Sequence, residues 1–354
     1  MQRIHPRQIG SEEAAALINA LREPLDSLLK GGQQAVAYSL LKLLQQWPGD
    51  RQWVDERLRD IYRQWVPRWH FEMLNDAPRA QAYADALATV NLTGKTVLDI
   101  GAGSGLLAMI AVRSGAKHVY ACEMVRPIAA KAEEIVRQNG LQNRITIIPK
   151  SSFEMEIGRE MPERAQLMVS ETFDYGFVGE GFLRSLRHAK QTLLKPDAVL
   201  VPCGMKLCGV LIESADIHGM NFVERSQGFD VSGMNEFSAT TYFPVRLRTR
   251  RHRILSGVET LVEADLHDAI PCSMTRTVEF TAAQHGIAHG VAFWFAAVLA
   301  PGVTLTNSPD QPQSHWTQAF ATFCKPIRVQ KNRPYLVRVT ISDESVSIAP
   351  VLNQ

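Results

Sequence analysis

The sequence has few cysteines, and their arrangement excludes two classes of protein. Its 354 residues include five cysteines, Cys122, Cys203, Cys208, Cys272 and Cys324, an odd number without a Cys-x-x-Cys pair. Such scattered positions support neither a disulfide framework nor a zinc site. We therefore expect reduced thiols and no bound metal, as in a cytoplasmic protein.

Long apolar runs and net charge are missing as well. No stretch of about 18 apolar residues occurs, and residues 1–7 lead into a charged helix rather than into an apolar secretory segment. A formal net charge of +2 provides no field that would attract nucleic acid or an acidic membrane. With 45% hydrophobic residues, the chain is predicted to be globular and soluble, without a membrane partner and with nucleic acid disfavoured.

The periodicity of apolar residues divides the chain into three parts. Helical spacing at residues 11–31, 36–44 and 53–65 predicts a helical extension over 1–66, which we interpret as packing against the body, with docking of a partner as the alternative. Strands and amphipathic helices alternate up to residue 202, which predicts a doubly wound α/β domain over 67–202. Short strands at 206–213, 277–281, 290–299 and 335–340 predict a mostly antiparallel β domain over 203–354.

A glycine-rich turn is the first candidate site. Gly101, Gly103 and Gly105 follow an apolar strand that contains Asp99, so backbone N–H groups can approach a ligand at the start of a helix. Glu123 ends the next strand, where an acid accepts hydrogen bonds from the ribose hydroxyls of an adenosine. The turn looks like the S-adenosylmethionine loop of methyltransferases.

Two alternatives for this turn remain open. A dinucleotide enzyme would need its third glycine at Leu106, whose branched side chain obstructs close packing of helix and strand. A turn without any ligand would leave Asp99 as a costly polar residue at a purely structural strand end.

The second candidate site is a loop with two glutamates, Glu171 and Glu180, nine positions apart after the apolar strand at 166–169. A guanidinium presents five N–H donors in a fixed fork and binds carboxylates in pairs, so paired glutamates suit arginine better than lysine. Combined with the glycine turn, this loop predicts methylation of an arginine side chain.

From about Trp69 to its end, the chain resembles the protein arginine methyltransferases. Residues 71–79 resemble the family's helix that closes over the cofactor, the paired glutamates fall on its double-glutamate loop, and Ser314-His315-Trp316 resembles its Thr-His-Trp loop. The resemblance implies an α/β Rossmann-like methyltransferase domain followed by a mostly antiparallel β-barrel domain, with the helical extension in front.

The resemblance also implies roles for single residues. Glu171, Glu180, His315 and Asp76 are the implied catalytic residues, the last two as a pair that relays a proton or orders the closing helix. Met73 and Trp316 are implied to contact substrate. S-adenosylmethionine is the implied cofactor, and its implied ligands are Arg79, Asp99, Gly101, Gly103, Gly105, Glu123, Ser152 and Glu154.

Departures from the family pattern bear on product and adenine recognition. Phe153 stands where many members have an acid, and Gly181-Phe182 replaces the Ser-Met pair of the asymmetrically dimethylating branch. The chain looks closer to the monomethylating branch, although it has a single catalytic module. We expect monomethylarginine as the product, with Phe182 limiting the room beside the clamp or, alternatively, pointing into the core.

The partners follow from the same resemblance. The substrate is an arginine-containing protein or peptide, with free arginine or another small guanidine or amine as the alternative, and a catalytically silent scaffold as a third possibility. Residues 220–230 resemble the start of the family's dimerisation arm, placed near 219–250, which reaches to the cofactor domain of a second subunit. A homodimer is therefore expected.

Overall fold

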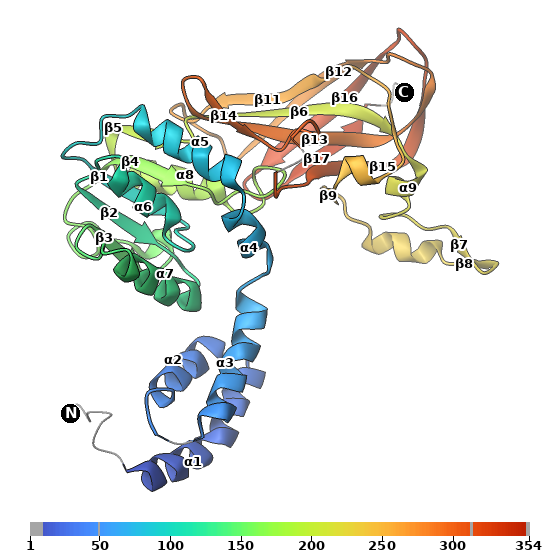
Figure 1. Cartoon of the computed structure of the whole chain (residues 1–354). Coiled ribbons are helices and arrows are strands. Elements are labelled where there is room, and N and C mark those ends of the chain that lie inside the picture. The colour runs from blue at the N-terminus through green and yellow to red at the C-terminus, as the bar shows by residue number, and fades with distance from the viewer. Residues whose placement is uncertain (1–9, 49, 312–313, 352–354) are drawn as a thin grey trace.

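A computed structural model describes residues 10–48, 50–311 and 314–351, so the N-terminal residues 1–7 considered above lie outside the described part. Figure 1 shows an α/β domain beside an antiparallel β domain, with a helical unit joined below them. None of the helices in the described ranges is long and apolar enough to cross a bilayer. The five cysteines are free, and these ranges contain no cluster of three or more metal-ligating side chains.

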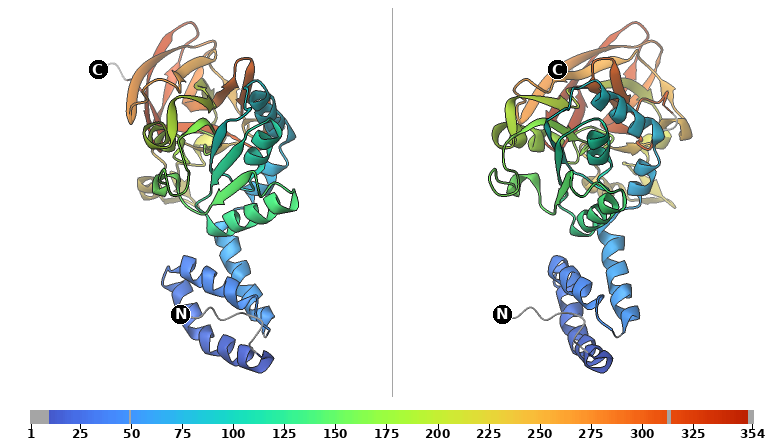
Figure 2. Two further views of the ribbon diagram at one scale, coloured as in Figure 1. Left: turned by 90° about the vertical axis from the view of Figure 1, so that its left-hand side faces the viewer. Right: turned by 60° about the vertical axis from the view of Figure 1, so that its left-hand side comes forward.

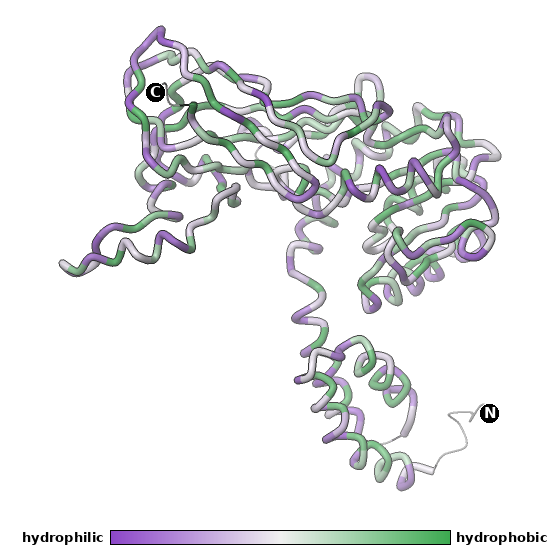
Figure 3. Tube along the Cα trace, turned by 180° about the vertical axis from the view of Figure 1, so that it is seen from behind, coloured by the Kyte–Doolittle hydropathy of each residue, from purple (hydrophilic) through white to green (hydrophobic). Residues whose placement is uncertain are grey.

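The helical extension has a core of its own, which corrects the interpretation that it packs against the body. Its helices are α1 (Ser11–Lys30), α2 (Gln34–Leu44) and α3 (Arg51–Trp65), and their buried apolar faces meet one another. Hydrophobic residues recur along all three helices in Figure 3. Both views of Figure 2 show the unit held away from the body by α3. One polar contact between the two parts is the hydrogen bond from Arg126 Nη1 to Ser39 Oγ, at 3.4 Å.

The closing segment is broken into two helices rather than one. Helix α4 (Trp69–Leu74) ends before Asp76, and α5 (Ala77–Ala88) begins after it. The break arises because the Asp76 carboxylate accepts a hydrogen bond from the Arg79 amide as an N-cap, while Pro78 suits the first turn, where a missing N–H costs nothing.

The α/β domain contains a five-stranded parallel sheet in the order β3-β2-β1-β4-β5. Its central strand β1 is buried at every position, as expected for a parallel sheet covered on both faces. The strands are β1 (Thr96–Ile100), β2 (His118–Cys122), β3 (Ile145–Ile148), β4 (Ala165–Ser170) and β5 (Leu194–Val201). The helices are α6 (Leu106–Arg113), α7 (Arg126–Gln138), η2 (Ser152–Glu154) and α8 (Phe182–Thr192).

The antiparallel domain consists of two sheets, so the expected barrel is a loose description. A seven-stranded sheet runs β10-β6-β13-β15-β9, with β11 beside β6 and β14 beside β13, and a second sheet runs β12-β16-β17. The larger sheet contains β6 (Gly204–Glu213), β9 (Phe243–Val245), β10 (Arg253–Ile254), β11 (Glu259–Asp265), β13 (Gly286–Ala300), β14 (Val303–Thr306) and β15 (Gln318–Val329). The smaller sheet contains β12 (Ser273–Thr281), β16 (Pro334–Ser342) and β17 (Val346–Pro350).

A projecting arm lies between β6 and β9, at residues 219–241. Figure 1 shows it extending away from the β domain. It follows the short helix α9 (Ala215–His218) and contains the hairpin β7 (Arg225–Ser226) and β8 (Phe229–Asp230) and the turn η3 (Ser232–Phe237), while the turn η4 (Leu247–Thr249) follows β9. Several of its large apolar residues are exposed, with Phe229 at 72% and Phe237 at 78%.

One continuous core joins the α/β and β domains. Phe173, which follows β4, stacks on Phe177 at 4.6 Å and on Trp316 of the β domain at 5.7 Å. Phe182 and Phe295 complete this aromatic group through edge-on contacts with Phe173. The segment after β4 is therefore anchored between both domains.

The separate core of the extension yields a test of its independence. Leu41→Ala removes a fully buried side chain of α2, and we expect it to destabilise α1 to α3 by about 2–5 kcal/mol. Leu43→Ala on the same helix is the control, because Leu43 is 55% exposed and its loss costs at most about 0.5 kcal/mol. Hydrogen exchange should show faster opening of the extension alone, and an equal loss of protection in β1 would contradict this.

Candidate functional site

The glycine turn after β1 has the shape that the sequence predicts. Gly101 and Gly103 adopt φ values of 77° and 53°, in the left-handed region where a side chain is disfavoured. A Cβ on Gly101 would lie 2.2 Å from Thr172 Cγ2, whereas one on Gly103 would meet nothing within 4 Å. Gly103 thus borders open space, as a backbone that receives a ligand requires.

Two acids face this turn. Glu123 is 7% exposed, and its carboxylate accepts hydrogen bonds from the amides of Gly103 at 3.0 Å and Val125 at 2.8 Å. Asp99 is completely buried, and neither of its oxygens has a hydrogen-bond partner among the described residues. Burial raises the pKa of Asp99 to about 7 and also raises the pKa of Glu123. A buried carboxyl without a partner, at the end of the strand that leads into the glycine turn, fits a site for a polar ligand.

The adenine-side residues lie on η2, and one of them is already engaged. Ser152 is buried, whereas the Glu154 carboxylate accepts a hydrogen bond from the Ser151 amide at 3.2 Å and completes a capping box. Phe153 is 40% exposed, and the Arg184 guanidinium lies 4.8 Å above its ring. The structure places Ser152 and Glu154 at the two ends of this turn without assigning either to adenine.

The acidic loop, residues 171–181, is held in an unusual backbone shape. Phe177 has φ of 74°, which is strained for an aromatic residue and recurs at functional sites. Asp174 Oδ1 accepts hydrogen bonds from the amides of Gly176 at 2.9 Å and Gly179 at 3.0 Å. The loop is thereby closed around one carboxylate, with a glutamate at each end.

Glu171 is one half of a buried ion pair. Its Oε2 lies 2.5 Å from Nε of Arg79, and both side chains are only 4% exposed. Burial raises the pKa of Glu171, and the positive charge of Arg79 opposes that rise. Two residues of the predicted site, one implied for cofactor and one for substrate, therefore meet directly.

Glu180 has a different environment. It forms no ion pair within 4 Å in the described ranges, and the residue is exposed to solvent. Although solvent reaches this residue, desolvation by the surrounding protein atoms and the nearby negative charges of Asp174 and Glu171 raise the pKa of Glu180 to about 7. A bound cation would relieve that repulsion, so the position of Glu180 favours a positively charged group.

The structure brings His315 and Asp76 together, as the resemblance implies. The Asp76 carboxylate accepts hydrogen bonds from the His315 amide at 3.0 Å and from its Nδ1 at 2.9 Å. Burial raises the pKa of Asp76, but these bonds and the hydrogen bond from the Arg79 amide hold that pKa below its usual value. Burial lowers the pKa of His315, so a neutral imidazole lies beside the N-terminus of α5.

The remaining predicted residues are Trp316, Met73 and Phe182, and each contacts other residues of the protein. Trp316 is 8% exposed and belongs to the aromatic group described above, and the Met73 carbonyl accepts a hydrogen bond from Arg79 Nη1 at 3.4 Å. Phe182 is fully buried and contacts Phe173 and Phe177 edge-on. It therefore points into the core, and the expectation that it limits the room beside the clamp is wrong.

Sequence reasoning missed Asp174 and Tyr242. Tyr242 is the residue before β9, and its hydroxyl donates a hydrogen bond to Asp174 Oδ2 at 2.8 Å. An aspartate two residues before a glycine is a turn signal that could have identified Asp174. Tyr242 carries no comparable signal, because its partner is 68 residues away.

Family models match both domains. The model for the arginine methyltransferase oligomerization subdomain matches residues 205–348. The model for ribosomal protein L11 methyltransferase (PrmA) matches residues 81–169, which include the glycine turn and Glu123.

Individual relatives match over longer ranges. An arginine N(omega)-methyltransferase of Streptomyces achromogenes subsp. streptozoticus is 38% identical over 335 residues, which cover 95% of this chain and 91% of that protein. Protein arginine N-methyltransferase 9 of Mus musculus is 29% identical over 72% of this chain, which spans only 34% of that longer protein.

A solved structure extends the likeness to three dimensions. It is the Trypanosoma brucei PRMT1 enzyme-prozyme heterotetrameric complex with AdoHcy, which has a TM-score of 0.69 and 25% identity over 79% of this chain and 90% of that chain. The paired glutamates, the glycine turn and these matches lead to one conclusion: the chain belongs to the arginine methyltransferase family.

Proposed function

We propose that the protein transfers a methyl group from S-adenosylmethionine to a terminal guanidino nitrogen of arginine and gives monomethylarginine. The observation that carries this proposal is the acidic loop, which presents Glu171 and Glu180 beside the glycine turn. Paired carboxylates match the fixed donor fork of a guanidinium. The monomethylated product is supported by Gly181, which stands where the asymmetrically dimethylating branch has serine, and not by Phe182.

The residues around the glycine turn fit the cofactor. Bound S-adenosylmethionine supplies an electrophilic methyl group on a positively charged sulfur. Glu123 provides carboxylate acceptors for ribose hydroxyls, and the open side of Gly103 admits the ligand to the backbone. Arg79 donates from Nε to Glu171 and from Nη1 to the Met73 carbonyl, and its Nη2 has no acceptor in the described ranges. We assign Nη2 to the cofactor carboxylate.

Both glutamates act on the charge of the substrate. A guanidinium cannot lose its proton beforehand, because its pKa lies above about 12. Glu171 and Glu180 would hold two of its nitrogens and concentrate the positive charge there, which leaves the third nitrogen more nucleophilic. Fixing that nitrogen in line with the methyl group is an orientation effect that can contribute roughly 7–11 kcal/mol.

His315 and Asp76 have a defined proton arrangement. Since Asp76 is ionised, Nδ1 of His315 carries the proton that Asp76 accepts, and Nε2 is left as an acceptor. The same carboxylate caps α5 through the Arg79 amide. We assign the pair to ordering α5 and Arg79, with Nε2 available to accept the proton released after methyl transfer.

Free arginine is the second candidate substrate, and one observation favours it. The relative named arginine N(omega)-methyltransferase matches 95% of this chain, so the match includes most of the helical extension. Relatives named protein arginine N-methyltransferase 9, 6 and 7 match 72%, 78% and 76% of this chain, respectively. The extension is therefore shared with the relative whose name does not specify a protein substrate.

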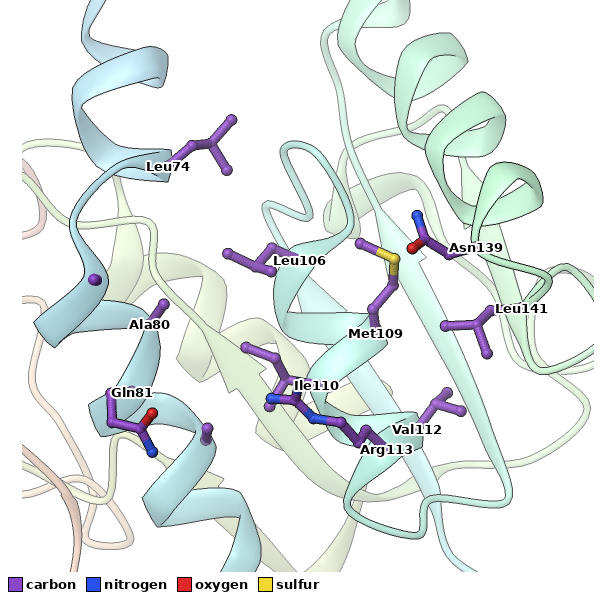
Figure 4. Close-up of a pocket in the computed structure, with 12 residues that line it drawn as sticks. Leu74, Ala80, Gln81, Leu106, Met109, Ile110, Val112, Arg113, Asn139 and Leu141 are labelled. Atoms are coloured by element: carbon purple, nitrogen blue, oxygen red, sulfur yellow. The ribbon is translucent and has the colours of Figure 1, made fainter.

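The exposed arm supports a homodimer, and the free cysteines agree with a cytoplasmic setting that keeps thiols reduced. A groove of about 790 Å³ between α4, α5 and α6 is lined mostly by apolar side chains, including Leu74, Leu106, Met109 and Leu141. Figure 4 shows these side chains on both sides of the groove. We propose that the exposed Phe229 and Phe237 of a second copy's arm fill it, because both surfaces are apolar and the same chain provides each of them.

Isosteric Glu→Gln variants separate the two halves of the site. We expect Glu180→Gln to bind cofactor normally but to lose methyl transfer about 30- to several-thousand-fold, because removing one partner of the charge pair formed with the bound guanidinium costs about 2–5 kcal/mol. Glu123→Gln should instead reduce the affinity for the cofactor. Calorimetry and labelled-methyl assays measure both. Normal turnover by Glu180→Gln would contradict the clamp.

The raised pKa of Glu180 predicts a pH dependence. A carboxyl whose pKa is raised to about 7 is neutral below that pH, so kcat/KM should fall as the pH decreases through about 7. Initial rates at saturating cofactor between about pH 5.5 and 8.5 test this prediction. A profile that stays flat over that range would show that Glu180 need not be charged.

Product analysis tests the reaction itself. Pure protein with S-adenosylmethionine should convert free arginine, or arginine-containing peptides, to monomethylarginine, and mass spectrometry of exhaustive reactions identifies the product. Preference for free arginine would select the second candidate. Dimethylarginine would refute the monomethylated product, and no turnover on either substrate would leave the scaffold alternative.

A charge placed on the arm should separate the subunits. Phe237→Asp puts a carboxylate on a side chain that is 78% exposed in the single chain, so folding should be unaffected while docking into the apolar groove is lost. Sedimentation analysis should change from dimer to monomer. Asn235 on the same turn is not substituted, because its side chain forms two hydrogen bonds with Val223 within the arm. A wild-type monomer would contradict the dimer.

A further inference from the structure

The acidic loop is fastened to the β domain by a hydroxyl group. Tyr242 donates its hydroxyl hydrogen to Asp174 Oδ2 at 2.8 Å, while Asp174 Oδ1 accepts the amides of Gly176 and Gly179 at 2.9 and 3.0 Å. One oxygen of the carboxylate thus closes the loop, and the other ties it to the residue before β9. Glu180 directly follows the second of these amides.

The space around this contact is tight. A Cβ on Gly179 would lie 2.3 Å from Asp174 Oδ2, and one on Gly176 would lie 2.6 Å from the Tyr242 ring. The Tyr242 ring also contacts Tyr175 and Phe293 edge-on, with centroids 5.5 and 5.4 Å apart. Only glycine fits at these two positions, so the loop backbone packs directly against the Tyr242 ring and the Asp174 carboxylate.

Tyr242 stands where the arm returns to the β domain. The arm is closed at its base by Asn221, whose side chain pairs with the amide and carbonyl of Ala239 at 2.8 and 3.0 Å. Asn235 closes it further out through two bonds of 2.9 Å to Val223. These four hydrogen bonds hold the two sides of the arm together, and Ala239 lies three residues before Tyr242.

We propose that Tyr242 and Asp174 are positioning residues that couple the docked arm to Glu180. An arm held by a second subunit fixes Tyr242, Tyr242 fixes Asp174, and Asp174 holds Gly179 so that Glu180 faces the guanidinium. The kinetic consequence rests on the proposed arginine methylation and the coupling rests on the proposed dimer, whereas the tether itself depends on neither.

Removal of the hydroxyl tests the tether. Tyr242→Phe keeps the ring and its packing but loses the bond to Asp174. Tyr335→Phe is the matched control, because its hydroxyl accepts a hydrogen bond of the same 2.8 Å length from the Gln330 amide, in the smaller sheet. We expect hydrogen exchange of the acidic loop to accelerate about ten- to a hundredfold in Tyr242→Phe only.

Kinetics then distinguish positioning from general stability. Tyr242→Phe should lower kcat by a similar factor with unchanged cofactor affinity, and its melting temperature should change no more than that of Tyr335→Phe. Wild-type loop exchange and wild-type kcat in Tyr242→Phe would overturn the proposal. If the wild-type protein methylates no arginine, the proposed function fails, while the exchange measurement still decides the tether.

A double-mutant cycle tests the coupling. Phe237→Asp should accelerate exchange of the acidic loop in the otherwise wild-type chain, because the undocked arm no longer fixes Tyr242. The same change should add nothing in a Tyr242→Phe background. Additive effects, or an unchanged loop in a monomeric Phe237→Asp variant, would overturn the coupling.

Discussion

The buried ion pair between Arg79 and Glu171 is the interaction on which the rest of the site depends. Both side chains are 4% exposed, so loss of either would leave an uncompensated charge in the interior. Arg79 comes from α5, Glu171 from the loop after β4, and Asp76, which caps α5, holds His315 from the β domain. One buried charge pair and its neighbours thus draw together three segments that are distant in the sequence.

The two glutamates of one loop differ because their surroundings differ. Arg79 opposes the effect of burial on Glu171, whereas Glu180 has only like charges nearby and a pKa of about 7. Acids in different surroundings can take different roles in one active site. Here Glu171 already has a counter-charge in Arg79 before substrate binds, whereas Glu180 gains one only when a cation binds.

Much of this architecture could be read from local patterns. The parallel sheet and the glycine turn were predictable because their signals lie within a few neighbouring residues, and the pairing of His315 with Asp76 followed from family resemblance. The two-sheet arrangement of the β domain was not, since strands such as β6 and β13 pair across about eighty residues. Equally, no local signal shows that Phe182 faces the core or that Tyr242 reaches Asp174.

The separate core of the helical extension has a thermodynamic consequence. Its buried residues pack among themselves, and the long helix α3 leads from it to the body. A chain with two such cores need not unfold in a single all-or-none transition. A melting temperature or a calorimetric enthalpy for the whole protein would then average two cooperative units, and the stability of the catalytic part would have to be read from its own transition.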